Sequence, residues 1–288
     1  LGVRDSARRL TDYSPAGRQG EAELARRTLR RLDVAERVPG AEQDIERRCG
    51  RLLRERLTAG LAVHEAGEEL RFVSNLFSPA HAVREVFVLA PKETDEDWAA
   101  IAERLRAVPD ALEGYRASLG LGLERDLPAG PRPTATVIEQ LTEWTTVGGA
   151  GRGWFGEFAA TGPEPLRAEL QAAARSAQTA VVGLRDWLRD TYAPAIEGAP
   201  DTVGRERYAR WTRYYNGTDL DLDEAYGYGW AEYHRILGDM RVAAEEVLPG
   251  AATPWEALGW LDQHGRHIEG VDEVRHWLQG LMDEAIVA

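Results

Sequence analysis

Apolar residues recur at steps of three and four along almost the whole chain, which is the spacing of one face of an amphipathic α-helix. The longest such segment runs from about Pro165 to Tyr192. Its inward-facing positions would be Leu166, Leu170, Ala173, Ala177, Val181, Leu184, Leu188 and Tyr192. We expect this helix to stop at Pro194, because an interior proline lacks the amide N–H and clashes with the preceding turn.

A second long helix is expected to begin after Asp221. Asp221 and Glu224, three residues further on, have the spacing of a capping box, in which side chains satisfy the free N–H groups of the first turn. The inward positions of this helix would be Leu222, Tyr226, Trp230, Tyr233, Leu237, Met240, Ala244 and Leu248.

Other segments extend the helical pattern. We expect a helix from Ile45 to Leu61, and another capped by Thr94 with acidic residues in its first turn. Pro109 suits the first turn of a following helix. The segment 83–90, VREVFVLA, is the only short run with the pattern of a strand. The predicted fold class is therefore all-α, a multi-helix array of long amphipathic helices with little or no sheet.

The length of 288 residues allows one or two domains. We interpret residues 1–288 as a single helical domain, with a subdivision at the glycine-rich segment 148–153 as the alternative. The last helical stripe includes Trp277 and Leu281 and runs on without a Gly, Asn or Pro stop signal. We therefore expect the chain to be the N-terminal portion of a larger protein.

Charge and cysteine content narrow the class of protein. With 35 Lys and Arg against 48 Asp and Glu, the net charge of −13 argues against nucleic acid or an anionic membrane as partner. No run approaches the roughly 18 apolar residues of a membrane span.

Cys49 is the only cysteine, so an internal disulfide framework is excluded. Cys49 lies on a helical stripe, which predicts a small core residue, and we expect a cytoplasmic protein.

Two histidine segments contain metal-binding residue types. His64 begins HEAGE, which resembles the zinc-protease HExxH, but Glu68 stands where the second histidine is required. We therefore expect His64 to be a partly buried histidine with a satisfied hydrogen bond. His264 and His267 are separated by Gly265, which predicts a helix end and a polar loop rather than two ligands on one helical face. No metal ligand is predicted in this chain.

Several longer segments resemble one bacterial family. The segment from Tyr192 to Met240, which contains GRERYARWTRYYNGTDLDLDE, is similar to the middle of proteins grouped as domain of unknown function 885. The segment from Phe77 to Leu119, with its Pro-Lys-Glu-Thr turn, resembles an earlier part of the same family, and DYSPAGR near the start also fits. The similarity extends over essentially the whole chain.

The resemblance implies a parent enzyme that is a metallohydrolase, of peptidase-like activity, with an HExxH helix in its C-terminal half. That motif does not occur anywhere in residues 1–288. The chain would therefore be the N-terminal half, inactive alone and cofactor-free, and zinc is expected in the full-length protein. Its partners would be the missing C-terminal half and a small peptide-like substrate, with no nucleic acid and no membrane.

In such an enzyme this half would form one wall of the cleft and position the substrate. Our candidates are Arg213, Tyr215 and Asn216. An arginine can hold a carboxylate and a tyrosine can donate to a developing oxyanion. The alternative for these three is ordinary helix-end packing and a turn at Asn216-Gly217. The alternative for the whole chain is a non-catalytic helical protein-interaction module.

Overall fold

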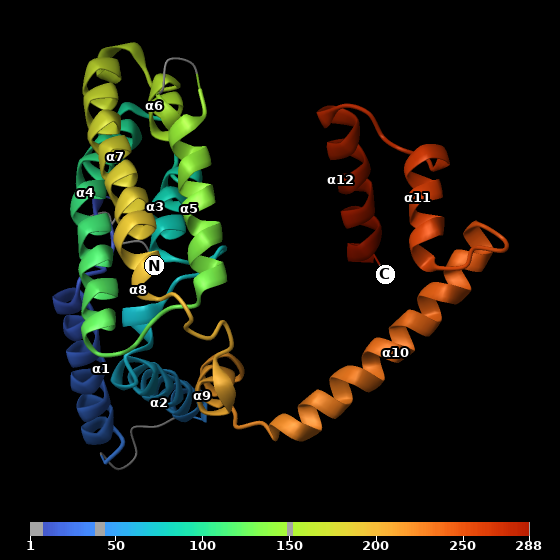
Figure 1. The fold of residues 1–288 in the computed structure, drawn as a ribbon, viewed down its shortest axis with the longest axis horizontal. Helices are drawn as coiled ribbons and strands as arrows, with labels where there is room; N and C mark the ends of the chain where they lie inside the picture. The colour runs from blue at the N-terminus through green and yellow to red at the C-terminus, as the bar shows by residue number, and fades with distance from the viewer. Residues whose placement is uncertain (1–7, 38–43, 149–151, 288) are drawn as a thin grey trace. The chain divides into compact units, whose positions relative to one another are not determined.

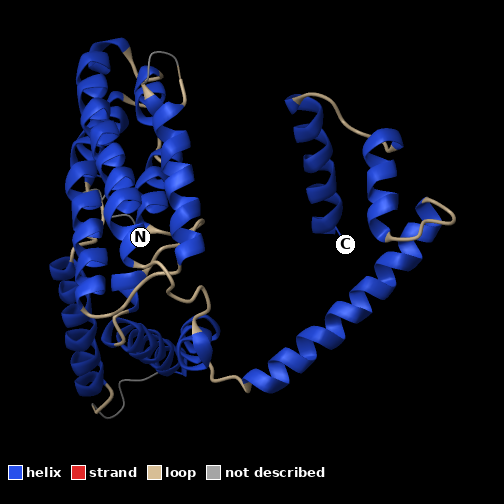
Figure 2. Cartoon of the chain, in the orientation of Figure 1, coloured by secondary structure: helices blue, strands red, loops and turns tan. Residues whose placement is uncertain are grey.

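The computed structural model describes residues 8–37, 44–148 and 152–287, and every regular element in these ranges is a helix (Figures 1 and 2). The all-α prediction is confirmed. Contacts between residues divide the chain into two compact units, residues 1–219 and 220–288. Segment 148–153 falls inside the first unit, and its residues 149–151 lie outside the described ranges. The single-domain interpretation stays a prediction, and we describe each unit by itself.

The first unit is a bundle of helices of very different lengths. Its elements are α1 (Pro15–Ala35), α2 (Asp44–Glu65), the 3-10 helix η2 (Glu68–Arg71), α3 (Pro79–Val88), α4 (Asp95–Glu124), α5 (Pro131–Thr146), α6 (Gly153–Ala160), the 3-10 helix η4 (Glu164–Leu166), α7 (Arg167–Trp187), the π-helical turn η5 (Leu188–Tyr192), α8 (Ala193–Ala195) and α9 (Gly204–Asn216).

The centre of this bundle is the contact between α4 and α7, which run side by side in the same direction (Figure 1). Arg106 of α4 pairs with Glu169 near the start of α7, and Arg116, further along α4, lies over the ring of Trp187 at the end of α7. The stripe predicted along α7 is buried from Leu170 onward. The inward positions of the longest predicted helix are thereby confirmed, apart from the half-buried Leu166.

Helix α4 confirms one expectation and corrects another. Thr94 and Asp97 form a reciprocal capping box at its start. No new helix begins at Pro109, which lies inside the continuous helix Asp95–Glu124. The proline removes one N–H from the ladder. Leu105 and Leu112 on either side are both buried, and this packing holds the two halves in one helix.

Two further predictions are wrong. The segment 83–90 is not a strand: residues up to Val88 belong to α3, whose Val83 and Phe87 are one turn apart and both buried. Cys49 is exposed rather than a core residue. The helix predicted around it exists as α2, but the burial of α2 is concentrated near its end, at Ala59 and Val63.

The second unit consists of α10 (Leu222–Val247), α11 (Pro254–His264) and α12 (Val271–Val287). Asp221 caps α10 as predicted, accepting hydrogen bonds from the N–H groups of residues 223 and 224. The buried residues of these helices are few: Ala244, Pro254 and Ala257. Of the eight inward positions predicted for α10, Ala244 is buried, four are half-buried, and the three aromatic ones, Tyr226, Trp230 and Tyr233, are exposed.

Among the described residues, no helix combines the length and the apolar character that crossing a membrane requires.

Candidate functional site

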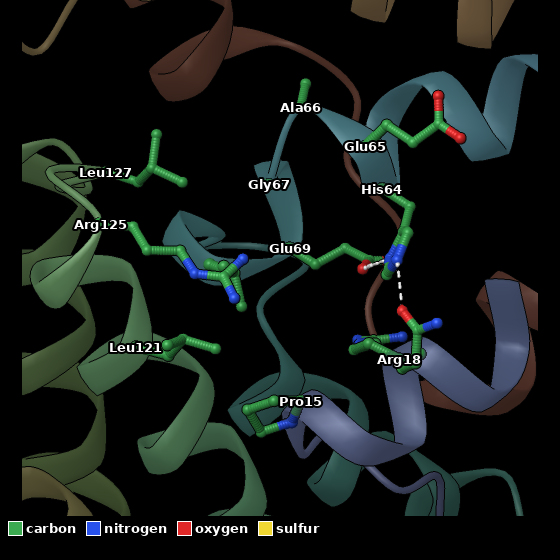
Figure 3. Close-up of a pocket in the computed structure, with 12 residues that line it drawn as sticks. Pro15, Arg18, His64, Glu65, Ala66, Gly67, Glu69, Leu121, Arg125 and Leu127 are labelled. Atoms are coloured by element: carbon green, nitrogen blue, oxygen red, sulfur yellow. Dashed lines mark hydrogen bonds and ion pairs between the residues drawn. The ribbon is translucent and has the colours of Figure 1, made fainter.

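A pocket in the first unit is formed where α1 begins, α2 ends and α4 ends, with a volume of about 530 Å³ (Figure 3). Ser14 caps α1 by accepting from the N–H of Gly17 at 3.1 Å, and Pro15 follows in the first turn. Gly67 has a φ of +67°, which favours glycine, and this backbone reverses the chain between α2 and η2. The reversal brings His64 and Glu69 to the same wall of the pocket.

His64 and Glu69 form the polar pair of this wall. His64 Nδ1 lies 2.7 Å from Glu69 Oε2, and His64 Nε2 lies 3.4 Å from Oε1 of Gln19 on α1 (Figure 3). The two side chains are only 19% and 24% exposed. The prediction of a partly buried, hydrogen-bonded His64 is therefore confirmed.

The pocket contains one side chain suited to proton transfer. A histidine held by a carboxylate can exchange a proton with a bound molecule. The residues that line the pocket include no Ser, Thr, Cys or Lys that this histidine could activate as a nucleophile.

A buried carboxylate lies directly behind this wall. Glu68 is 1% exposed and accepts hydrogen bonds from Arg71 at 2.8 Å and from Arg207 and Arg210 on α9. The indole N–H of Trp211 donates to the same carboxylate at 3.3 Å. Burial by itself raises the pKa of Glu68, but Arg207, Arg71 and Trp211 together outweigh this effect and the net pKa is lowered. The cluster joins η2 to α9 with an ionised glutamate.

A second polar cluster lies on the inner side of α3. His81 Nδ1 is 2.7 Å from the hydroxyl of Ser78, the residue that precedes the helix, and its Nε2 is 3.0 Å from Oε1 of Gln140. Burial lowers the pKa of His81, and Arg84 one turn further on adds to this effect. The guanidinium of Arg84 lies between the rings of Trp144 and Trp154, 4.8 and 4.9 Å from their centroids. Both nitrogens of His81 are satisfied, so this cluster is a structural one.

The three candidate residues from the sequence lie together at the end of α9. Arg213 pairs with Asp219 at 2.9 Å and with Glu55 at 3.4 Å. Tyr215 is 69% exposed and stacks on Trp211. The amide of Asn216 donates to the carbonyl of residue 212 at 2.9 Å, and Gly217 closes the helix with a φ of +72°. These contacts are the helix-end arrangement that we considered as the alternative, and a role in substrate binding stays a prediction.

The other histidine segment is a helix end, as predicted. Gly265 terminates α11 after His264, whose Nδ1 lies 3.0 Å from the carbonyl oxygen of Trp260. His267 Nε2 lies 3.6 Å from Glu269. Within the described ranges, no group of three or more His, Cys, Asp or Glu side chains is arranged to hold a metal ion.

The sequence reasoning did not identify the Glu68 cluster or the arginines of the pocket. Arg207, Arg210 and Trp211 are spaced three and four residues apart, which places them on one face of α9. That spacing was a usable signal for a shared basic and aromatic face. Its partner Glu68 lies 139 residues away from Arg207, and nothing local indicates this contact.

Comparison with known proteins relates the chain to a family and to solved structures. The family described as "Bacterial protein of unknown function (DUF885)" matches residues 1–288. No curated protein matches the chain. A structure described as that of "a putative lipoprotein of unknown function" from Shewanella oneidensis is similar with a TM-score of 0.62 and 13% identity. The similarity covers 98% of this chain but 52% of that one, so this chain spans about half its length. The chain belongs to the DUF885 family of bacterial proteins.

Proposed function

We propose that this chain is the helical, cleft-forming part of a zinc-dependent hydrolase of peptidase-like activity. Residues beyond these 288 supply the metal and the catalytic groups. Family membership over the whole chain and coverage of only half of the similar structure support this proposal. The chain contributes walls and substrate contacts.

The observation that carries the proposal is the exposed apolar surface of the second unit. The large side chains exposed there by more than a third include Trp230, Tyr233, Trp255, Trp260, Trp277 and Leu281. Large apolar side chains left exposed in this number are typical of an interface. The predicted inward stripe of α10 has the composition of a core, so the interface we propose is with the rest of the same polypeptide.

Zinc does not fit the residues described here. A catalytic zinc needs three protein ligands, usually His, Asp, Glu or Cys, and no such group occurs in the described part of the chain. The pair His64–Glu69 offers only two such side chains, already bonded to each other. We therefore derive no catalytic step through a metal in this chain.

Metal analysis and a hydrolysis assay test the proposal. We expect stoichiometric zinc in the full-length protein, none above background in residues 1–288, and cleavage of short peptides by the full-length protein alone. A full-length protein that binds no divalent metal contradicts the hydrolase proposal.

The second candidate is a non-catalytic helical interaction module. The same exposed aromatic side chains on α10–α12 favour it, because aromatic residues are enriched at interfaces between proteins. Full-length protein that is inactive on peptides but forms a stable complex with another protein would support this candidate. The cytoplasmic location stays a prediction, which cell fractionation tests.

A further inference from the structure

Two pockets of the first unit adjoin, because Arg18 and Glu69 line both of them. The larger is the pocket of His64, with about 530 Å³, and the smaller has about 160 Å³. Together they have room for a small molecule with a polar and an apolar end.

The carboxylates around these pockets already have partners within this chain. Glu65 pairs with Arg26 at 3.0 Å, and Glu69 pairs with His64. Glu68 is held by the guanidinium groups of η2 and α9. None of these acids uses the two arginines that line the larger pocket.

Those two arginines retain free donors. The side chain of Arg18 is 19% exposed, its guanidinium lies over the ring of Tyr13, and its ion pair with Glu21 uses a single terminal nitrogen, which leaves further N–H groups for a bound carboxylate. Arg125 is the C-cap residue of α4, and it makes no ion pair within the described ranges. Figure 3 shows Arg18 and Arg125 entering the pocket from different helices. Guanidinium groups in this position are suited to a carboxylate, which they bind through charge-assisted hydrogen bonds.

The smaller pocket has aromatic walls. Phe72, Trp211 and Tyr214 line it, with ring centroids 6.2 Å apart for Phe72–Trp211 and 5.6 Å apart for Trp211–Tyr214. Trp211 is fixed by its hydrogen bond to Glu68. A flat apolar group would pack against these rings without displacing a polar contact.

We propose that the adjoining pockets bind a small aromatic carboxylate. Its carboxylate contacts Arg18 and Arg125, and its ring lies against Trp211 and Tyr214. The two arginines come from α1 and from the end of α4. The rings come from Phe72, which directly follows η2, and from α9. The Glu68 cluster joins η2 to α9 and so sets the distance between the arginine end and the aromatic end of the site. The site uses only residues of this chain and does not depend on the hydrolase proposal.

Binding of N-acetylphenylalanine to the full chain, measured by titration calorimetry, tests the site. N-acetylphenylalaninamide has the same ring but no carboxylate, and acetate has the carboxylate but no ring. We expect saturable binding of the acid, and at least roughly tenfold weaker binding of both other probes, because each lacks one half of the recognition.

Arginine variants locate the binding. We expect Arg125→Gln and Arg18→Gln each to weaken binding of the acid by at least roughly fivefold, since a hydrogen bond to a charged group is lost. Arg116→Gln is a matched control: Arg116 also has an ion pair three residues away and a ring beneath it, but lies outside both pockets. Arg125 carries no ion pair within the described ranges, so Arg125→Gln removes no such contact of the fold. This variant therefore still tests the site if Arg18→Gln disturbs folding.

Three results would overturn the proposal. They are an absence of saturable binding of the acid, equal affinity for the acid and its amide, and equal loss of affinity in Arg116→Gln and Arg125→Gln.

Discussion

The carboxylate of Glu68 and the guanidinium of Arg207 form a two-pronged ion pair, with Arg207 Nε 3.0 Å from both oxygens and its terminal nitrogen 2.8 Å from Oε2. The pair connects the short helix after α2 to α9, 139 positions later. Glu68 is almost completely buried, so it depends on its partners in the protein rather than on water. This contact is a buried polar link to α9, whose Trp211 and Tyr214 line the smaller pocket.

Removing the charge of Glu68 is expected to destabilise the first unit. Glu68→Gln keeps the shape of the side chain but leaves three arginines without their shared anion, which costs about 3 kcal/mol in the free energy of unfolding. Urea unfolding followed by circular dichroism measures this change. The control is Glu113→Gln, which removes an exposed pair with Arg116 and is expected to cost less than about 0.5 kcal/mol. Equal costs for the two variants would show that the Glu68 cluster contributes no more than a surface ion pair.

The same carboxylate predicts a pH dependence in acid. Because the pKa of Glu68 is lower in the folded protein than its ordinary value of 4.5, its contribution to stability is fully present above that value. The contribution is lost as the pH falls through the lowered pKa. We expect the difference in unfolding free energy between wild type and Glu68→Gln to be constant near neutral pH and to shrink below about 4.5. A difference that does not change with pH would contradict the lowered pKa.

His81 predicts a second pH dependence, at higher pH. Burial holds its pKa below the ordinary value of 6.5, so the unfolded chain binds a proton there that the folded protein does not. Stability should fall as the pH drops below 6.5 and the loss should level off below the lowered pKa. His81→Gln retains a polar side chain that does not titrate, and thermal unfolding between pH 7 and 5 should show a smaller loss for this variant than for wild type. The same loss in both proteins would assign it to other groups.

Apolar spacing and helix-cap residues predicted much of the helical structure. Where these predictions were wrong, the cause is physical. The stripe from Leu170 to Tyr192 and the cap at Thr94 depend on neighbouring residues, and both are confirmed. Pro109 and Val83–Ala90 were misread because burial against other helices overrides a local preference. Cys49 has the spacing of a core position, but the start of α2 lies away from the centre of the bundle.

The pockets were harder to predict for a related reason. Each is assembled from residues far apart in the chain, such as Arg18, Arg125 and Trp211. Sequence spacing shows which residues share a helix face, but it carries no information on which faces meet. His64 was correctly interpreted because its main partner, Glu69, is only five residues away.

The proposed substrate role of the α9 end can be tested in the full-length protein. If Arg213 and Tyr215 contact substrate, Tyr215→Phe and Arg213→Gln should each lower kcat/KM for peptide hydrolysis by roughly tenfold or more. Tyr215 is exposed, so its variant should leave the unfolding free energy unchanged. Asn216→Ala removes the hydrogen bond to the carbonyl of residue 212 and should reduce stability slightly, with an effect on kcat/KM only if Asn216 also contacts substrate. Unchanged kinetics in all three variants would leave helix-end packing as their role.

Trp277 on α12 tests whether the rest of the polypeptide covers the second unit. Its side chain is 49% exposed in the described structure, so Trp277→Ser should change the stability of residues 1–288 by less than about 0.5 kcal/mol. In the full-length protein the same change should cost about 3 kcal/mol, because a packed tryptophan would be replaced by a cavity. Glu284→Gln, an exposed position on the same helix, serves as control and should have little effect in either protein. A small effect of Trp277→Ser in both proteins would mean that this face is not covered by the rest of the chain, and would favour the interaction module instead.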